Sequence, residues 1–370
     1  MVPELNVAVT SYLLLAVPAS AVVLVWWKRM RNHMPSAANS WGRLPTCLAN
    51  GRLATCPTNS QGGRWSGGEV AVACLTIYLI GPVVVMPLLN AAHFFDLFYD
   101  ARPHEIVQRL WAGLFALPLS LALVFLLLNR ISQTGCADLG ISPARWRENI
   151  GWGCAGFVLA TPIVLGLFAL LNKLPNVTPH PFAVFVQQRL TPLEWGLFFY
   201  GAVVYAPITE ELIFRGLLQG WLRRASLDSH LAVLGIVSAF SVMSALPPES
   251  GDGFLEFVAG VNWWRLGFTA VLVVVYLGLL RRHAGKGLLR AEDPAQQPGN
   301  SGLAIVGSAM SFAFVHPPWP DPIALFLLGL ILGWLASRTQ SLLPGVLLHA
   351  LFNAVAWLTL LLSRVWPAGS

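Results

Sequence analysis

Residues 194–222 read EWGLFFYGAVVYAPITEELIFRGLLQGWL. The run is apolar for most of its length and is longer than the roughly 20 residues with which an α-helix crosses the hydrocarbon core of a membrane. It nevertheless contains two adjacent carboxylates, Glu210 and Glu211, and a guanidinium, Arg215. An ionised side chain near the bilayer centre costs on the order of 3 kcal/mol. The stretch therefore predicts a membrane-spanning helix, and its charged cluster is the first candidate for a functional site.

The whole chain has the composition of a membrane protein. Of its 370 residues, 56% are hydrophobic and 11% are charged, and the mean hydropathy is +0.64. These values exclude an ordinary soluble domain and predict an all-α fold, a polytopic transmembrane helical bundle. The protein is expected to be integral and multi-pass, in the cell membrane if it is prokaryotic. We expect about ten membrane segments, near residues 8–27, 70–90, 106–128, 150–171, 194–222, 230–246, 266–280, 303–316, 322–336 and 341–363.

The net charge of +6 has a simple origin in membrane topology. Basic pairs such as Arg223–Arg224 and Arg281–Arg282 fall in loops on one predicted side, whereas acidic residues such as Asp96 and Asp100 fall on the other. This is the positive-inside bias of multi-pass proteins. Membrane lipids are therefore expected partners, and nucleic acid is not. The five cysteines form no Cys-x-x-Cys pair, so neither a disulfide framework nor a cysteine-based zinc site is expected.

The first polar motif is Glu210-Glu211-x-x-x-Arg215. On a helix, Glu211 and Arg215 are neighbours at i,i+4 and can neutralise each other. Glu210 points about 100° away from that pair, because successive helical residues rotate by this angle. It is thus a spare carboxylate, available to take a proton from water. The alternative is an ion pair at a helix end near the membrane surface, which Arg223 and Arg224 would mark.

Two further motifs follow on separate apolar segments. Phe312-Ala-Phe-Val-His316 ends one segment, and His349-Ala-Leu-Phe-Asn353 lies well inside the last one. His316 alone fits a satisfied residue at the membrane interface, and Asn353 alone fits a hydrogen bond between packed helices. One carboxylate with two imidazoles is also a set that can bind zinc or activate a water. An asparagine and a histidine can stabilise an oxyanion.

These three motifs, in this order, resemble the Glu-Glu-x-x-x-Arg, Phe-x-x-x-His and His-x-x-x-Asn motifs of the CPBP intramembrane proteases. That family includes the type II CAAX prenyl endopeptidases and bacteriocin-processing or immunity proteins. The resemblance covers roughly residues 194–363, including the connection Arg338-Thr-Gln-Ser-Leu-Leu-Pro-Gly-Val-Leu-Leu-His349. Each motif alone is weakly specific, but three in order are highly specific.

The resemblance implies a glutamate-dependent peptidase and assigns a role to each motif residue. Glu210 would activate the water, Glu211 and Arg215 would orient it, and His316 would help to position the water or a metal. His349, with the asparagine four residues after it, would stabilise the tetrahedral oxyanion.

Members of the family are often described as metalloproteases. Zinc is therefore a possible cofactor, and its ligands would be Glu210, His316 and His349. The sequence does not decide whether the reaction needs the metal.

The resemblance also divides the chain into two parts. Residues 1–190 are predicted to form N-terminal transmembrane helices with a polar loop near 32–68 and no recognised motif. Residues 191–370 are predicted to form the protease core, with an apparent insertion near 230–300, because the first two motifs lie further apart than is usual in the family.

The leading functional hypothesis is an intramembrane endopeptidase that hydrolyses a peptide bond in a membrane-embedded, lipidated or prenylated (CAAX-type) substrate with a glutamate-activated water. One alternative is a non-catalytic immunity or scaffold protein that keeps the motif residues for structure. A proton-coupled transporter is the other alternative. It is disfavoured because the intramembrane ionisable residues are confined to the C-terminal half, without a duplicated set.

Overall fold

The computed structural model describes residues 48–49, 52–53, 65–143, 145–173, 177, 180–247, 258–285, 301–316 and 318–365. The segment expected near 8–27, and most of the polar loop expected near 32–68, lie outside these residues. Two short strands, β1 (Leu48–Ala49) and β2 (Arg52–Leu53), pair antiparallel. All other regular structure in the described part of the chain is helical.

The first half of the fold contains the elements α2 (Gly67–Leu79), η1 (Ile80–Val85), α3 (Met86–Ala91), η2 (Phe94–Leu97), α4 (Glu105–Ser132), η3 (Cys136–Leu139), α5 (Trp146–Leu171) and α6 (Pro181–Phe185). The second half contains α7 (Pro192–Phe199), η4 (Tyr200–Tyr205), α8 (Ala206–Glu210), η5 (Glu211–Leu218), α9 (Gln219–Leu222), α10 (Leu227–Met243), α12 (Trp263–Gly285), α13 (Ser301–Phe314), α14 (Asp321–Thr339) and α15 (Leu343–Val365). The elements η1, η4 and η5 are π-helical, and η2 and η3 are 3₁₀ helices.

The prediction of a polytopic helical bundle is confirmed. Among the described residues, seven helical segments are long and apolar enough to cross a membrane, and α10 and α13 are shorter apolar helices. The protein is thus an integral, multi-pass membrane protein. The structure does not establish the expected count of ten, because two of the ten are short helices and the segment near 8–27 is not described.

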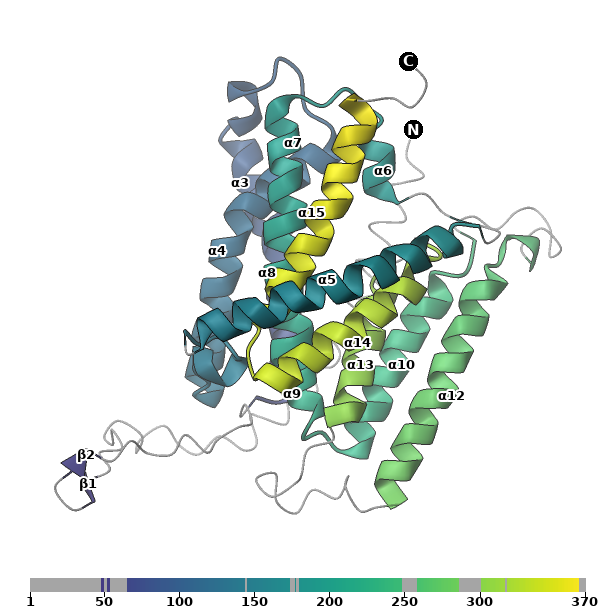
Figure 1. Ribbon diagram of the computed structural model, residues 1–370. Helices are drawn as coiled ribbons and strands as arrows, with labels where there is room; N and C mark the ends of the chain where they lie inside the picture. The colour runs from purple at the N-terminus through teal and green to yellow at the C-terminus, as the bar shows by residue number, and fades with distance from the viewer. Residues whose placement is uncertain are drawn as a thin grey trace.

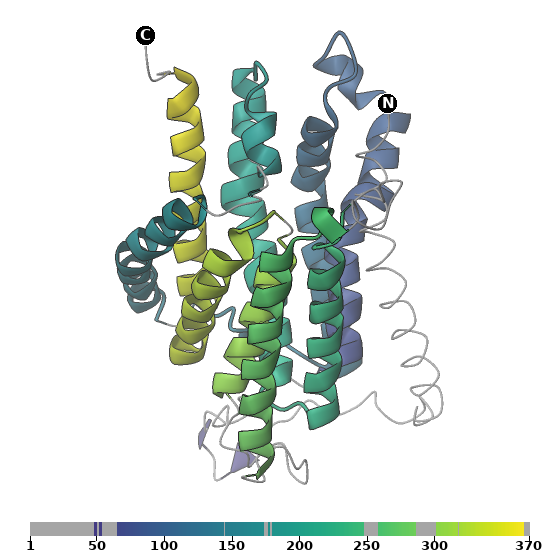
Figure 2. The ribbon, with the colours of Figure 1, turned by 90° about the vertical axis from the view of Figure 1, so that its right-hand side faces the viewer.

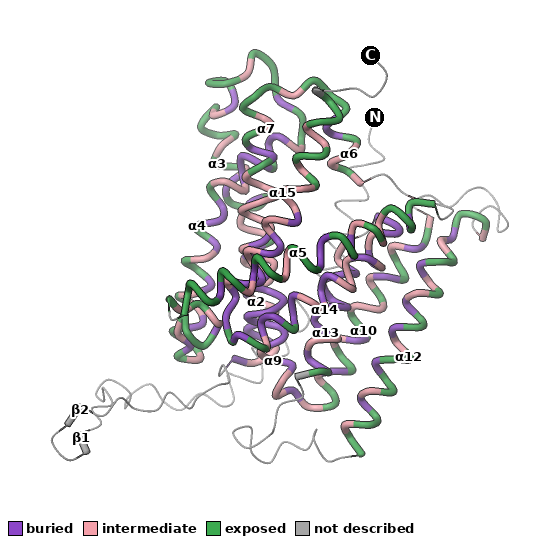
Figure 3. Tube along the Cα trace, in the orientation of Figure 1, coloured by how far each residue is buried: buried purple, intermediate pink, exposed green. Residues whose placement is uncertain are grey.

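The helix that carries the first motif lies at the centre of the bundle. In each predicted span we compare the buried share of the most apolar stretch. This share is 50% in Pro192–Leu222 and in α14, and 22–33% in the other five spans. Figures 1 and 2 show α10, α12, α13 and α14 grouped together. In both views α7, the end of α15 and the start of α4 extend above this group. In Figure 3 the buried positions gather around α9, α13 and α14, and exposed ones line α5 and α12.

Local sequence explains how this central helix begins and bends. It starts at a capping box, in which the Thr191 hydroxyl accepts from the amide of Glu194 and the Glu194 carboxylate accepts from the amide of Thr191. Pro207 lies in the first turn of α8, and a proline ring displaces the carbonyl four residues earlier, that of Val203. Val203 lies in the π-helical η4, so the chain absorbs the proline in a wide turn and stays helical.

The helices α10 and α12 fall within the insertion expected near 230–300, and both pack on α13. The guanidinium of Arg265, fully buried, donates from Nε to the carbonyl of Ser241 at 3.1 Å and from Nη2 to the carbonyl of Phe314 at 3.5 Å. It therefore links the ends of α10 and α13. Because α13 ends just before His316, this link fixes the part of the fold from which the second motif projects.

Candidate functional site

The centre of the site is a fully buried ion pair. Arg215 Nη1 lies 3.1 Å from Glu211 Oε1, and neither side chain is exposed to solvent. Arg215 also donates from Nη2 to the carbonyl of Gly329 on α14 at 3.4 Å, and its guanidinium lies 4.4 Å from the ring centre of Phe312 on α13. The first motif is thus packed against two other helices, as expected for a buried charge that has to be compensated.

His349 joins this pair from α15. Its Nδ1 lies 3.1 Å from Glu211 Oε1, the same oxygen that Arg215 contacts. One turn earlier, a Cβ atom on Gly345 would lie only 2.7 Å from Glu211 Oε2, so a glycine is needed for the carboxylate to lie against α15. Sequence reasoning missed Gly345. The available signal was its position four residues before His349, on the same helical face.

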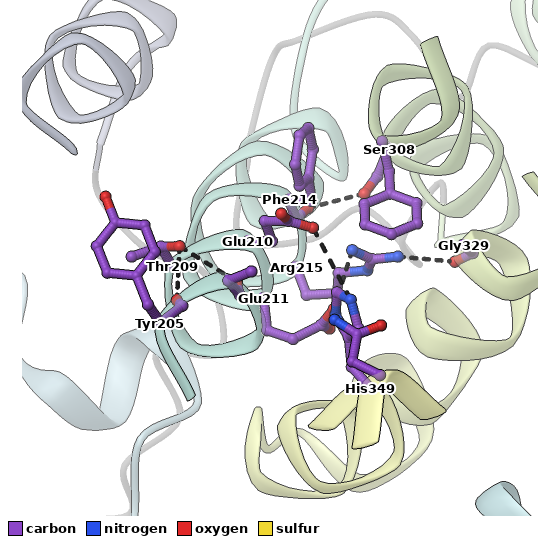
Figure 4. Close-up of polar contacts among 12 residues, drawn as sticks. Tyr205, Thr209, Glu210, Glu211, Phe214, Arg215, Ser308, Gly329 and His349 are labelled. Atoms are coloured by element: carbon purple, nitrogen blue, oxygen red, sulfur yellow. Dashed lines mark hydrogen bonds and ion pairs between the residues drawn. The ribbon is translucent and has the colours of Figure 1, made fainter. Parts of the chain in front are cut away.

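Glu210 lies between the two imidazoles. Its Oε2 is 3.9 Å from Nε2 of His316 and 3.9 Å from Nε2 of His349. This oxygen is buried and has no hydrogen-bond partner among the described protein groups. Figure 4 shows the Glu210 carboxylate turned towards His349, next to the Arg215 guanidinium. The Glu210 and His316 side chains are 18% and 26% exposed, so this side of the cluster is the accessible one.

The hydrogen bonds of the two histidines fix which ring nitrogen carries the proton. His316 Nδ1 lies 2.7 Å from the carbonyl oxygen of Phe312, which can only accept. His349 Nδ1 faces the carboxylate oxygen of Glu211 that also pairs with Arg215, and this oxygen accepts. Both Nδ1 atoms therefore donate, and in the neutral rings both Nε2 atoms present a lone pair to Glu210.

One water can bridge Glu210 and an imidazole at this spacing. Because a water has only two protons, it can donate to two of the three lone pairs at once. With hydrogen bonds of about 2.8 Å, a water that bridges partners 3.9 Å apart subtends an angle near 90°. Tetrahedral zinc ligands at about 2.0–2.1 Å stand only about 3.4 Å apart, so both imidazoles would have to move towards Glu210. Among the residues that the structure describes, no three His, Cys, Asp or Glu side chains are grouped to hold a metal. The zinc set of Glu210, His316 and His349 stays a prediction.

Asn353 lies one turn beyond His349 and makes a different contact from the one expected. Its Nδ2 donates to the carbonyl of Ala202 in η4 at 2.8 Å. A carboxamide nitrogen carries two protons, so this bond leaves one for another acceptor. The structure places Asn353 as a link between α15 and η4, and its expected role at an oxyanion stays a prediction.

A further residue that the sequence did not single out supports the first motif from behind. Ser308 on α13 donates to the carbonyl of Phe214 in η5 at 2.8 Å and is fully buried. Its hydroxyl fixes the motif helix against α13, which also carries Phe312 and leads to His316. No local pattern around Ser308 distinguishes it from other small residues of an apolar helix.

Comparison with known proteins identifies a matching family. Residues 192–291 and 290–355 match the family described as type II CAAX prenyl endopeptidase Rce1-like. The matched region contains all three motifs. No curated protein and no solved structure matches the chain significantly.

Proposed function

We propose that this protein is an intramembrane endopeptidase in which Glu210 activates the attacking water. Residues 192–355 match the Rce1-like family of type II CAAX prenyl endopeptidases, which is a protease family. One observation carries the proposal. An unpartnered, buried carboxylate oxygen lies 3.9 Å from two imidazole nitrogens, at the spacing that one water bridges.

The reaction follows from these contacts. A water held by Glu210 and His316 gives a proton to Glu210 while its oxygen attacks the carbonyl carbon of the substrate. The tetrahedral intermediate then carries an oxyanion. His349 donates to it from Nε2 once a second proton, taken from solvent, makes the ring an imidazolium, and its Nδ1 proton stays hydrogen-bonded to Glu211. The carbon–nitrogen bond breaks, and the leaving amine takes the proton from Glu210.

The substrate class that we propose is a membrane-associated peptide with a prenylated cysteine near its carboxyl end. The match to type II CAAX prenyl endopeptidases supports a prenylated substrate. The position of Glu210 inside a membrane-spanning helix supports a scissile bond held at the membrane. A lipid anchor on the substrate would bring this bond to the depth of the site.

The test is cleavage of a quenched-fluorescent, farnesylated CAAX peptide by the purified protein in phospholipid vesicles. The Glu210→Gln variant keeps the size of the side chain but cannot take a proton, so its kcat should fall by roughly 100-fold or more. The matched control is Glu69→Gln, a buried carboxylate that caps α2 outside the site, and this variant should keep its activity.

Two outcomes would contradict the proposal. Equal cleavage by wild type and Glu210→Gln would remove Glu210 from the mechanism. Absence of cleavage by a folded wild-type protein, with farnesylated and unmodified peptides alike, would favour the non-catalytic scaffold. Treating the active protein with a zinc chelator and measuring bound zinc tests the metal separately.

A further inference from the structure

The motif helix carries a row of polar side chains that extends well beyond the catalytic residues. The row consists of four residues spaced four apart, which lie on one face of η5, of α9 and of the residue that follows α9. They are Glu211, Arg215, Gln219 and Arg223. Residues four apart lie on the same side of a helix. The row therefore runs from the buried ion pair to the basic end of the membrane span.

Each lower member of this row contacts the same face of α14. Gln219 Nε2 donates to the carbonyl of Gly333 at 3.0 Å and to the hydroxyl oxygen of Ser337 at 3.0 Å. Arg223 Nη2 donates to the same Ser337 oxygen at 2.7 Å. We call these residues, together with the contact between Arg215 and the carbonyl of Gly329, the polar seam.

Gln219 is the best-packed member of the polar seam. Its side chain is fully buried, and a Cβ atom on Gly333 would lie 2.9 Å from its Oε1. The close approach of the two helices therefore depends on a glycine at 333 and on the shape of the amide opposite. A buried amide that makes two hydrogen bonds resists displacement, because breaking them leaves polar groups unpaired at about 1–3 kcal/mol each.

The hydrogen bonds of Gln219 fix the position of the motif helix along α14. This position determines whether Arg215 can contact its partners. Arg215 lies one turn nearer the site on the same face, and its bond to the carbonyl of Gly329 is already long, at 3.4 Å. A small slide or rotation of the motif helix against α14 would break this bond and shift the guanidinium. Glu211 Oε1 contacts both Arg215 and His349, so a shift of Arg215 passes to the imidazole.

We propose that Gln219 is a positioning residue for the catalytic site, which acts through Arg215 and Glu211 on the orientation of His349. The kinetic consequence rests on the proposed peptidase function. The geometric consequence does not, because it concerns only the hydrogen bond between Glu211 and His349.

The first experiment compares Gln219→Met with Gln108→Met in the peptide assay. Methionine keeps the length of glutamine but removes its hydrogen bonds. Gln108 is a matched control, a buried glutamine of α4 that donates to the carbonyl of Pro103 at 2.8 Å, outside the site. We expect Gln219→Met to lower kcat about tenfold with KM unchanged within twofold, and Gln108→Met to keep both constants. A merely structural role would lower the melting temperature of both variants without this selective fall in kcat.

The second experiment reads the geometry without activity. In protein with ¹⁵N-labelled histidine, the His349 signals, assigned from their loss in His349→Gln, should show the Nδ1-protonated ring in the wild type. Gln219→Met should shift these signals towards a mixture of tautomers, and Gln108→Met should not. Gly333→Ala places a methyl group against the Gln219 amide and should shift the His349 signals in the same way. It is the variant to use if Gln219→Met does not accumulate.

Unchanged His349 signals in Gln219→Met and Gly333→Ala would overturn the inference. A wild type that cleaves nothing, but whose His349 signals respond to these changes, would remove the proposed function and leave the positioning role standing.

Discussion

The chain contains two glutamate–arginine pairs with the same spacing and opposite surroundings. Glu105 and Arg109 form an i,i+4 pair at the start of α4, with side chains 55% and 47% exposed. Glu211 and Arg215 form an i,i+4 pair in η5, with both side chains fully buried. The exposed ion pair lies within α4, whereas the buried pair also contacts α13, α14 and α15.

The difference shows that spacing alone does not give a charge pair its importance. An exposed i,i+4 pair stabilises a helix by about 0.3–0.5 kcal/mol. A buried pair has a large desolvation cost, which only good geometry and further hydrogen bonds offset. Glu211 and Arg215 meet this condition in part, through His349 and Gly329, whereas Glu211 Oε2 and Arg215 Nε have no hydrogen-bond partner among the described groups. The pair therefore belongs to a site rather than to a helix surface.

The largest expected difference between the pairs is in stability. Arg215→Met leaves Glu211 buried without its cation, which should lower the free energy of unfolding by about 3–5 kcal/mol. Arg109→Met removes an exposed partner and should change it by less than about 0.5 kcal/mol. Unfolding of both variants in detergent measures the contrast, and equal losses would show that the burial of the pair has no energetic weight.

The next contrast concerns room around the buried carboxylate. In Gly345→Ala, the new methyl would meet Glu211 Oε2 at 2.7 Å, and the carboxylate would have to leave His349. We expect kcat to fall about tenfold or more in the peptide assay. Gly166→Ala, in the middle of α5 with nothing near the new methyl, should keep full activity and gain up to about 1 kcal/mol of stability. Equal kcat values for the two variants would contradict the packing of Glu211 on α15.

The smallest expected effect is the pH dependence of stability that a partly buried histidine causes. This histidine, His180, lies outside the membrane-spanning segments. Burial lowers the pKa of His180 from 6.5 to about 4, with a smaller contribution from the charge of His316. Between these values the unfolded chain binds the proton and the folded chain does not, so stability should fall as pH drops from about 6.5 to 4. Melting temperatures across this range should fall less steeply for His180→Asn, and a parallel decline would contradict the assignment.

Much of the fold and the core of the site can be predicted from the sequence, for physical reasons. Long apolar runs indicate membrane-spanning helices, because lipid excludes unpaired polar backbone groups. A charge within such a run is costly, and this cost indicates a functional role for Glu210. The pairing of Glu211 with Arg215 follows from helical spacing, and the structure confirms this geometry.

Other features depend mainly on how the helices pack against one another. Gly345 and Ser308 matter only because other helices approach them closely. The wide π-helical turns around Pro207 could not be inferred from a proline alone. The contact between Asn353 and Ala202 also arises between distant segments, so spacing within one helix could not predict it.

The central claim is that Glu210, His316 and His349 converge on one hydrolytic water. The most direct measurement is an experimental map of the protein in lipid, at a resolution that shows ordered water, with anomalous data at the zinc edge. We predict a water oxygen within about 3 Å of Glu210 Oε2 and of an imidazole Nε2, and the anomalous data decide separately whether zinc is bound. A Glu210 carboxylate turned away from both imidazoles, or no ordered water beside it, would contradict the account.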